Sequence, residues 1–426
     1  MAPRLDTWKS IAHHMGKSAR TLQRWHRVYG LPVHHLSEES GSVFAYGDEL
    51  DAWLRSRSHS APGELDDAPE TEPAPPTPVC EYPRPRSRRL DSDLVSPRAK
   101  ERAAQLLALA ARMSDSLSPR NLNGIVLHYR EAVDLNPESA AAYAGLSTGL
   151  VAQGIWRLVH PPSAYAAATA ALQHAHALDS ELPLAVCANA WLKMLVSRDW
   201  QCARDGFDEI LKQSTTCKCA MNGRALLHVA EGSLENAARL LLKSAEQTPL
   251  SSYEMALYSW TIYLDGKFRH VLDQVKDLQA SGRQDPITDV VQALASIQHY
   301  GPRAAQERLE EIARESPQNE ALRGALGYAF AVNGEGQKAR ELLGPLVGSA
   351  IDSVGRDPYA VALVWIGLNE KHKALKCLKQ SYRSGSLWSL GFRSDPMLEP
   401  LRSDPQCRES LSELDYPAPT NGSARE

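Results

Sequence analysis

Apolar residues recur at helical spacing over most of this chain of 426 residues. From residue 98 to residue 411 they fall at every third or fourth position, and Gly, Asn or Pro interrupts them about every 15 to 20 residues. This period predicts one amphipathic helix after another, and the interruptions predict the turns between them. The pattern therefore predicts a mainly α fold.

A longer repeat is superimposed on this pattern. Each unit has a helix, a Gly or Asn turn, a second helix with a small residue in its first half, and then a polar or Pro break. The clearest units lie at 118–154, 215–249, 318–343 and 356–384, and matching positions are about 35 residues apart. In the first unit Tyr129, Ala132, Leu135 and Pro137 precede Tyr143, Leu146 and Gly154.

This order of bulky, small and turn residues resembles the tetratricopeptide (TPR) repeat family. The resemblance implies an α-solenoid of about eight helix pairs over residues 98–411, with a concave face that binds a protein or peptide. The closing stretch "FRSDPMLEPLRSDPQCRESL" resembles the polar cap that follows such arrays. Residues 412–426 are expected to form a flexible tail.

The first 58 residues have a different pattern. Trp8, Ile11, Ala12 and Met15 form one apolar stripe, which predicts a helix from about Thr7 to Met15 capped by Asp6 or Thr7. Gly16 ends this helix in a tight turn, and Ser18 caps a second helix that runs to about Tyr29. Two strands, Val33–Leu36 and Ser42–Tyr46, and a third helix, Asp48–Arg55, are expected to follow.

The second helix places Leu22, Trp25 and Tyr29 on one face and Arg20, Gln23, Arg24 and Arg27 on the other. A charged surface is the simpler interpretation of the basic row. However, no acidic residue lies between Trp8 and Leu36, so the row has no local ion-pair partner. Because Arg pairs bidentately with guanine and Gln with adenine, the row is also typical of a recognition helix in the major groove of DNA.

The pattern W-x-x-I-A-x-x-x-G-x-S-x-R-T-x-x-R-W, followed by G-L-P-V-H and V-F-A-Y, resembles the winged helix-turn-helix modules of excisionase-like and MerR-like bacterial regulators. The resemblance implies that residues 1–58 bind double-stranded DNA. The residues that it places in the DNA-facing part are Lys17, Ser18, Arg20, Gln23, Arg24, Arg27 and, in the wing, Ser42. The predicted wing tip departs from a phosphate-binding pattern because it carries Glu38 and Glu39.

Residues 59–97 contain nine Pro and two blocks of charge. This composition cannot bury enough apolar surface to offset the entropy of ordering, so it predicts a disordered linker. The net charge of −4 argues against a chain that coats nucleic acid along its whole length. No stretch approaches 18 consecutive apolar residues, so no membrane span is expected and the protein is expected to be cytoplasmic.

The sequence nominates no catalytic residue, cofactor-binding residue or metal ligand. It has no phosphate-binding Gly-rich loop, no H-E-x-x-H motif and no G-x-S-x-G motif. Of the seven Cys, only Cys217 and Cys219 are close in sequence, and all seven are interpreted as reduced thiols. An enzyme is therefore not expected.

Two functional hypotheses follow. The first is a sequence-specific DNA-binding transcriptional regulator whose solenoid binds a protein or peptide, with homodimerisation as a way to strengthen DNA binding. The alternative is a TPR protein-interaction scaffold in which the winged helix is a protein-binding module.

Overall fold

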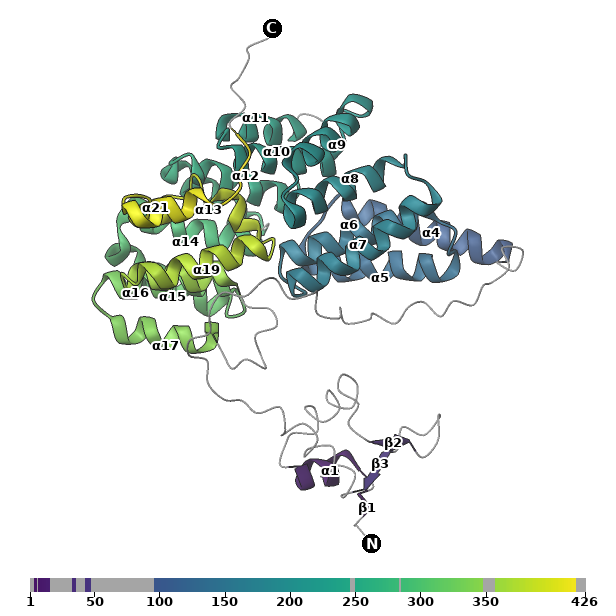
Figure 1. Cartoon of the computed structure of the whole chain (residues 1–426), viewed down its shortest axis with the longest axis horizontal. Helices are drawn as coiled ribbons and strands as arrows, with labels where there is room; N and C mark the ends of the chain where they lie inside the picture. Colours follow the sequence, from purple (N-terminus) through teal and green to yellow (C-terminus); the bar gives the residue numbers. More distant parts are fainter. Residues whose placement is uncertain are drawn as a thin grey trace. The chain divides into compact units, whose positions relative to one another are not determined.

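The structure is a computed structural model of the chain (Figure 1). It describes residues 4–5, 7–15, 33–35, 43–46, 96–245, 250–282, 285–347 and 357–418. Contacts divide the chain into two units, residues 1–77 and residues 78–426. We describe each unit separately.

The described part of the first unit is a small three-stranded sheet with one helix. Its elements are β1 (Arg4–Leu5), α1 (Trp8–Met15), β2 (His34–His35) and β3 (Val43–Tyr46). The strands are antiparallel in the order β1-β3-β2, with His34 opposite Phe44. The hydroxyl of Thr7 caps α1 by accepting from the backbone N–H of Ser10 at 3.1 Å, and Ile11 is fully buried.

The first helix and the two hairpin strands predicted from the sequence are therefore present, whereas β1 was not predicted. The predicted second helix, the hairpin tip and the third helix lie outside the described residues. The winged helix as a whole stays a prediction. So does the linker, because residues 59–95 also lie outside the described part.

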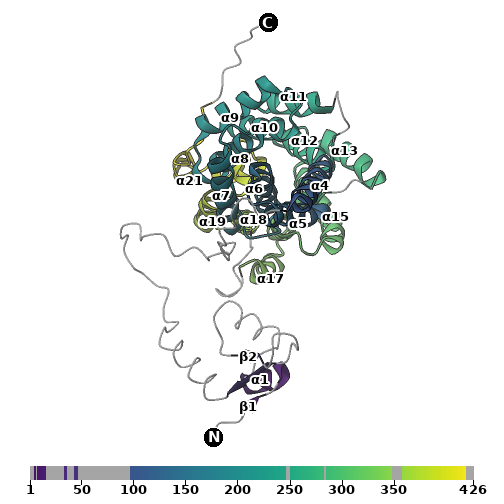
Figure 2. The ribbon, with the colours of Figure 1, turned by 90° about the vertical axis from the view of Figure 1, so that its right-hand side faces the viewer.

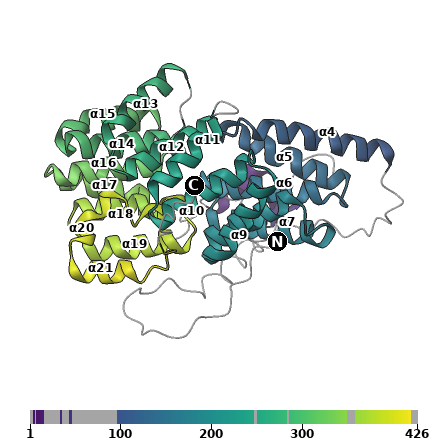
Figure 3. The ribbon, with the colours of Figure 1, turned by 90° about the horizontal axis from the view of Figure 1, so that it is seen from above.

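The second unit begins with a long series of helices (Figures 1 and 3). They are α4 (Pro97–Ser114), α5 (Pro119–Leu135), α6 (Ala140–Ile155), α7 (Pro161–Leu178), α8 (Pro183–Leu192), α9 (Trp200–Gln213), α10 (Lys218–Glu231), α11 (Leu234–Ala245), α12 (Ser252–Leu264), α13 (Phe268–Ala280), α14 (Pro286–Tyr300), α15 (Pro302–Glu315), α16 (Glu320–Val332), α17 (Gly336–Val347), α18 (Pro358–Gly367) and α19 (Lys371–Arg383). A π-helical turn, η2 (Lys193–Ser197), extends α8. Seen from above, the early pairs lie on one side of this unit and α13 to α17 on the other (Figure 3).

These helices form eight consecutive pairs within the described residues, from α4–α5 to α18–α19. Small residues let neighbouring helices of this array approach closely. A methyl group at Gly145 in α6 would lie 2.2 Å from the ring of Tyr129 in α5, and one at Gly223 in α10 would lie 2.3 Å from Phe207 in α9. The predicted array of about eight helix pairs is confirmed, and it begins at Pro97 with Ser96 as the cap.

The C-terminal stretch matches the expected polar cap only in part. It forms η3 (Leu387–Gly391), η4 (Pro396–Leu398), α20 (Glu399–Arg402) and α21 (Pro405–Ser412), and most of its apolar side chains are buried. Residues 387–401, which we call the inner segment, lie against the inner helices: Tyr263 of α12 donates to Asp395, and Phe392 stacks on Tyr359 of α18. The last helix, α21, packs instead on α19, the final helix of the array.

The predicted flexible tail from residue 412 begins too early. Tyr416 donates its hydroxyl hydrogen to the carbonyl of Ser389, and its ring stacks on Trp200 at 6.2 Å. Pro417 is buried, and its carbonyl accepts from Arg393 at 2.9 Å. The aromatic side chain of Tyr416 therefore holds the chain against the array as far as residue 418. Among the described helices, none is both long and apolar enough to cross a membrane.

Candidate peptide-binding site

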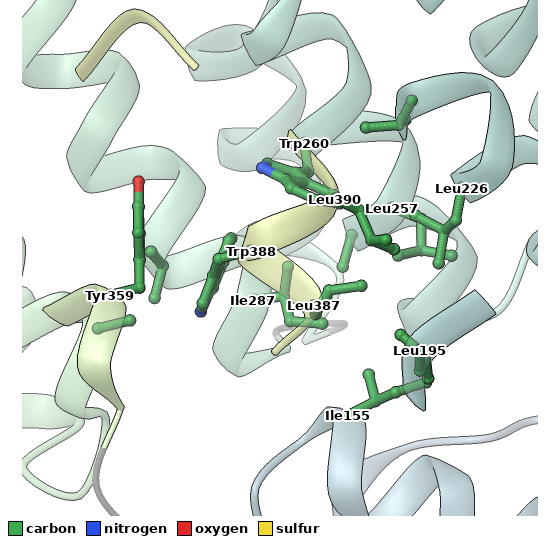
Figure 4. Close-up of a cluster of buried hydrophobic side chains, with 14 of the residues drawn as sticks. Ile155, Leu195, Leu226, Leu257, Trp260, Ile287, Tyr359, Leu387, Trp388 and Leu390 are labelled. Atoms are coloured by element: carbon green, nitrogen blue, oxygen red, sulfur yellow. The ribbon is translucent and has the colours of Figure 1, made fainter. Parts of the chain in front are cut away.

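The first helices of the pairs line the inner face of the array, and the inner segment covers its centre. Figure 4 shows Leu387, Trp388 and Leu390 lying among side chains from several inner helices. Trp388 stacks on Tyr359 of α18 and meets Trp260 of α12 edge to face, both at 5.6 Å between ring centres. The chain therefore fills with its own residues much of the surface that was expected to bind a partner.

A pocket remains open beside this covered region, between α6, α8, α10 and α12. Its volume is about 160 Å³. We call it the α6–α12 pocket. It is lined by Ser114, Asp115, Leu117, Ile125, Tyr129, Thr148, Gly149, Val151, Ala152, Ile155, Leu184, Trp191, Lys218, Cys219, Asn222, Ser251, Tyr253 and Glu254. Sites for drug-sized ligands are about 300–1,000 Å³, so a pocket of this size fits one or two side chains of a polypeptide.

Aromatic side chains form much of the pocket wall. Trp191 packs edge to face on Phe207 at 5.9 Å, and its indole N–H donates to the carbonyl of Cys219 at 3.3 Å. Tyr253 lies 4.6 Å from Trp156, measured between ring centres. Burial raises the pKa of Tyr253 well above its usual value. The wall is apolar and its polar atoms are fixed, so it favours an apolar side chain.

Two of the three charged groups that line the pocket, Lys218 and Glu254, are paired with each other. Lys218 Nζ lies 3.1 Å from Glu254 Oε2, and Glu254 accepts from the backbone N–H of Ser251 at 2.7 Å in a capping box at the start of α12. Ser244 donates to the other carboxylate oxygen of Glu254 at 3.2 Å. These bonds hold the start of α12 against α10, and the remaining charged group of the lining is the exposed Asp115.

Asn222 is the exception among the polar groups. It lies in α10, one turn after Lys218, and only 7% of it is exposed. Its side-chain oxygen Oδ1 is buried and has no hydrogen-bond partner within the described residues. A buried amide oxygen without a partner costs about 1–3 kcal/mol, so a ligand N–H that reached this atom would gain by binding.

A second, larger cavity of about 570 Å³ lies on the other side of Ile155. It is bounded by the loop after α6, the starts of α14 and α16, and the inner segment. Arg157 NH1 lies 4.0 Å from Asp357 Oδ1, and Asp357 is 1% exposed. Trp156 donates from its indole N–H to Asp285 at 3.4 Å. These contacts join the end of α6 to the N-cap residues of α14 and α18. The residues that line this cavity therefore connect an early helix pair to two later ones.

The residues predicted to contact DNA are not tested by this geometry. Lys17, Ser18, Arg20, Gln23, Arg24, Arg27 and Ser42 all lie outside the described residues. Within the described part, no three His, Cys, Asp or Glu side chains are arranged to hold a metal ion.

The residues of the pocket were not predicted from the sequence. Asn222 and Lys218 are spaced i, i+4 on the first helix of a predicted pair, and that spacing puts them on one face. The spacing was a usable signal, but only the packed structure shows that Asn222 has no partner. The inner segment was not predicted because its burial depends on α12, more than a hundred residues away, and on α18 at the same time.

Comparison with known proteins finds similarity among solved structures alone. No family model matches this chain, and no curated protein matches it. A solved structure of a tetratricopeptide repeat protein from Parabacteroides merdae is similar. It is 13% identical, with a TM-score of 0.28, over 71% of this chain and 98% of that chain. Helical arrays with so low a TM-score do not superpose as a whole, so neither the fold nor the function of this chain is inferred from this likeness.

Proposed function

We propose that this protein is a non-enzymatic scaffold of the TPR type, whose α6–α12 pocket binds an extended segment of a partner protein. The observation that carries this proposal is the buried, unpartnered Oδ1 of Asn222, a residue that lines the α6–α12 pocket. The repeat pattern, the eight helix pairs and the close approach at Gly145 and Gly223 support the TPR assignment.

The chemistry of the pocket defines the segment that it takes. Asn222 Oδ1 accepts a hydrogen bond from a backbone N–H of the bound segment, which fixes the position of its main chain. An adjacent apolar side chain of the segment enters between Trp191 and Tyr253. Because Lys218 and Glu254 neutralise each other and Trp191 and Tyr253 are aromatic, the side chain that enters between these two rings carries no charge.

The test uses the full-length protein. Peptides of about ten residues are selected from a random library against it, and their Kd values are measured by calorimetry. Asn222→Ala should weaken binding by about threefold to tenfold, the equivalent of one net hydrogen bond. The variant should be at least as stable as the parent protein, because it removes a buried acceptor that has no partner.

Asn236→Ala is the matched control. Asn236 lies in the second helix of the same pair, and its side-chain oxygen accepts from Arg239 at 3.1 Å away from the pocket. This control should bind selected peptides like the parent protein. Equal affinity of the parent and the Asn222 variant for every selected peptide would show that the pocket is not the site.

A second candidate function is DNA binding by the first unit. The specific observation in its favour is that α1 packs on β3 and that β2 and β3 pair as the hairpin expected of a wing. In this proposal Lys17, Ser18, Arg20, Gln23, Arg24, Arg27 and Ser42 contact DNA, and two copies bind together for useful affinity.

Binding of the full-length protein to duplex DNA at rising salt tests this candidate. Each phosphate contact contributes about −0.9 to the slope of log affinity against log salt. The double variant Arg20→Ala, Arg24→Ala should bind preferred sites more weakly than the parent protein, with a smaller loss on random DNA. Absence of binding at about 50 mM salt would leave only the scaffold function.

A further inference from the structure

The larger cavity, at the end of α6, has the size of a small-molecule site. Its volume is about 570 Å³, and sites for small ligands measure about 300–1,000 Å³. Its lining includes the apolar side chains of Ile155, Ile287 and Leu387 and the indoles of Trp156 and Trp388. These walls favour a ligand with an apolar body.

Carboxylates outnumber basic groups in this lining. Among the described residues that form it, Glu315, Glu320 and Asp357 are acidic and Arg157 is basic, and Glu315 is exposed to solvent. Three of the described helices, α14, α16 and α18, begin at the cavity, and two, α6 and α15, end there. A helix start carries about half a positive charge and a helix end about half a negative one, so these contributions largely cancel. The negative charge of the carboxylates therefore remains, and it attracts a cation.

Two buried carboxylate oxygens at the cavity have no hydrogen-bond partner within the described residues. They are Oδ2 of Asp357, which lines the cavity, and Oδ2 of Asp285, which precedes the lining residue Pro286. Both aspartates are 1% exposed. Their Oδ1 atoms are already used, because each caps its helix by accepting from the backbone N–H two residues later. A ligand N–H that reached a free oxygen would offset the cost of burying it, so the cavity favours a ligand that donates hydrogen bonds.

We propose that the larger cavity binds a small aliphatic amine as its ammonium ion. The ammonium group donates a charge-assisted hydrogen bond to the carboxylate of Asp357, and the indoles of Trp156 and Trp388 add attraction for the cation. The methylene groups of the amine contact the apolar wall. This inference does not rest on the proposed binding of peptides in the α6–α12 pocket.

The test measures binding of 1,4-diaminobutane to the full-length protein by calorimetry. 1,4-Butanediol is the matched ligand, because it has the same carbon chain and no charge. The diamine should bind and raise the temperature of unfolding, whereas the diol should do neither. No binding of the diamine at concentrations up to about 10 mM would overturn the proposal and would mean that water satisfies the buried oxygens. Equal binding of the diamine and the diol would also overturn it.

Asp357→Asn keeps the oxygen that caps α18 and removes the charge. It should weaken binding of the diamine by about tenfold to a hundredfold, as loss of a hydrogen bond to a charged group does. Asp404→Asn is the matched control, because Asp404 caps α21 by accepting from the N–H of Gln406 at 3.1 Å and is not part of the cavity lining. Each variant removes one negative charge, so equal affinities in the two variants would show that the diamine is attracted only by the net charge of the protein.

Glu315→Gln tests the same cavity without touching a buried group. Because Glu315 is exposed, the temperature of unfolding should stay unchanged, while binding of the diamine should weaken by about twofold to fivefold. Asn222→Ala, in the α6–α12 pocket, should bind the diamine like the parent protein. Unchanged affinity in Glu315→Gln together with a loss in Asn222→Ala would place the amine in the α6–α12 pocket and overturn the proposal.

Discussion

Gly223 shows how single residues set the spacing of the helix pairs. A methyl group there would lie 2.3 Å from the ring of Phe207, which is fully buried. Gly223→Ala should therefore lower the free energy of unfolding by about 1–3 kcal/mol, as overpacking of a core does. Urea unfolding of the full-length protein measures the change.

Gly344→Ala is the control for this prediction. Gly344 is an exposed residue inside α17, and a methyl group there meets no atom within 4 Å. Replacing a helical Gly by Ala should raise the free energy of unfolding by about 0.5–1 kcal/mol. The same sign of change at both positions would contradict the contact between Gly223 and Phe207.

Asp285 makes the stability of the array depend on pH. It caps α14 by accepting from the N–H of Ile287 at 2.9 Å, it is 1% exposed, and burial raises its pKa from 3.8 to about 7. The folded chain holds this proton more tightly than the unfolded chain does. The free energy of unfolding should therefore fall as pH rises from about 4 to about 7.

Asp285→Asn keeps the capping oxygen and removes the ionisation. At pH 8 the variant should be more stable than the parent protein by on the order of 2–4 kcal/mol, and at pH 4 the difference should disappear. Thermal unfolding at the two pH values measures it. If Asp285→Asn raised the free energy of unfolding by the same amount at pH 4 and pH 8, the raised pKa of Asp285 would be contradicted.

At the scale of elements, η3 contributes buried side chains to the hydrophobic core between the inner helices. Trp388 is 7% exposed and contacts rings of both α12 and α18. Trp388→Ala should lower the free energy of unfolding by about 3–5 kcal/mol because it leaves a large cavity. Tyr300→Ala, at a position that is 58% exposed in α14, should change it by less than about 0.5 kcal/mol. Similar losses in the two variants would mean that η3 is dispensable.

The helix pairs could be predicted from the sequence, whereas the packing of the inner segment against them could not. The period of apolar residues and the small residues at Gly145 and Gly223 are local signals, since each pair packs on its neighbour. The burial of Trp388 depends on α12 and α18 at once, so no local pattern reports it. The same holds for Asn222, whose missing partner is visible only after packing. The DNA-facing residues from Lys17 to Arg27 remain predictions from the sequence.

At the scale of the second unit, bonds join pairs that are far apart in the chain. In a linear repeat protein each pair contacts only its neighbours. Here the hydroxyl of Tyr165 donates to the carbonyl of Gly385 at 2.9 Å, and the indole N–H of Trp200 donates to the carbonyl of Asp415 at 3.0 Å. Figure 2 shows the pairs from α9 to α13 following one another round a curve. The early pairs are thus bound to the last one.

Arg198 is the central residue among these contacts between the early pairs and the last one. Its backbone is left-handed, with φ of 55°, and its guanidinium donates to the carbonyl of Tyr382 at 2.7 Å and to Ser389 Oγ at 2.9 Å. The guanidinium also lies over the ring of Tyr382, 4.3 Å from its centre. Only 8% of Arg198 is exposed, so these bonds are shielded from water. Losing them should uncouple α4–α9 from the pairs that follow.

The whole second unit should therefore unfold in one step. Native-state hydrogen exchange should give the same opening free energy for the central amides of α6, α12 and α18 in the parent protein. In Arg198→Ala the amides of α6 should exchange through a separate opening of lower free energy, while those of α12 and α18 keep a common value. Arg239→Ala, at an exposed position in α11 where the side chain is 68% exposed, should keep a single value for all three helices. Different values for α6 and α18 in the parent protein would mean that the array behaves as a linear repeat, with the bonds of Tyr165, Arg198 and Trp200 too weak to couple its ends.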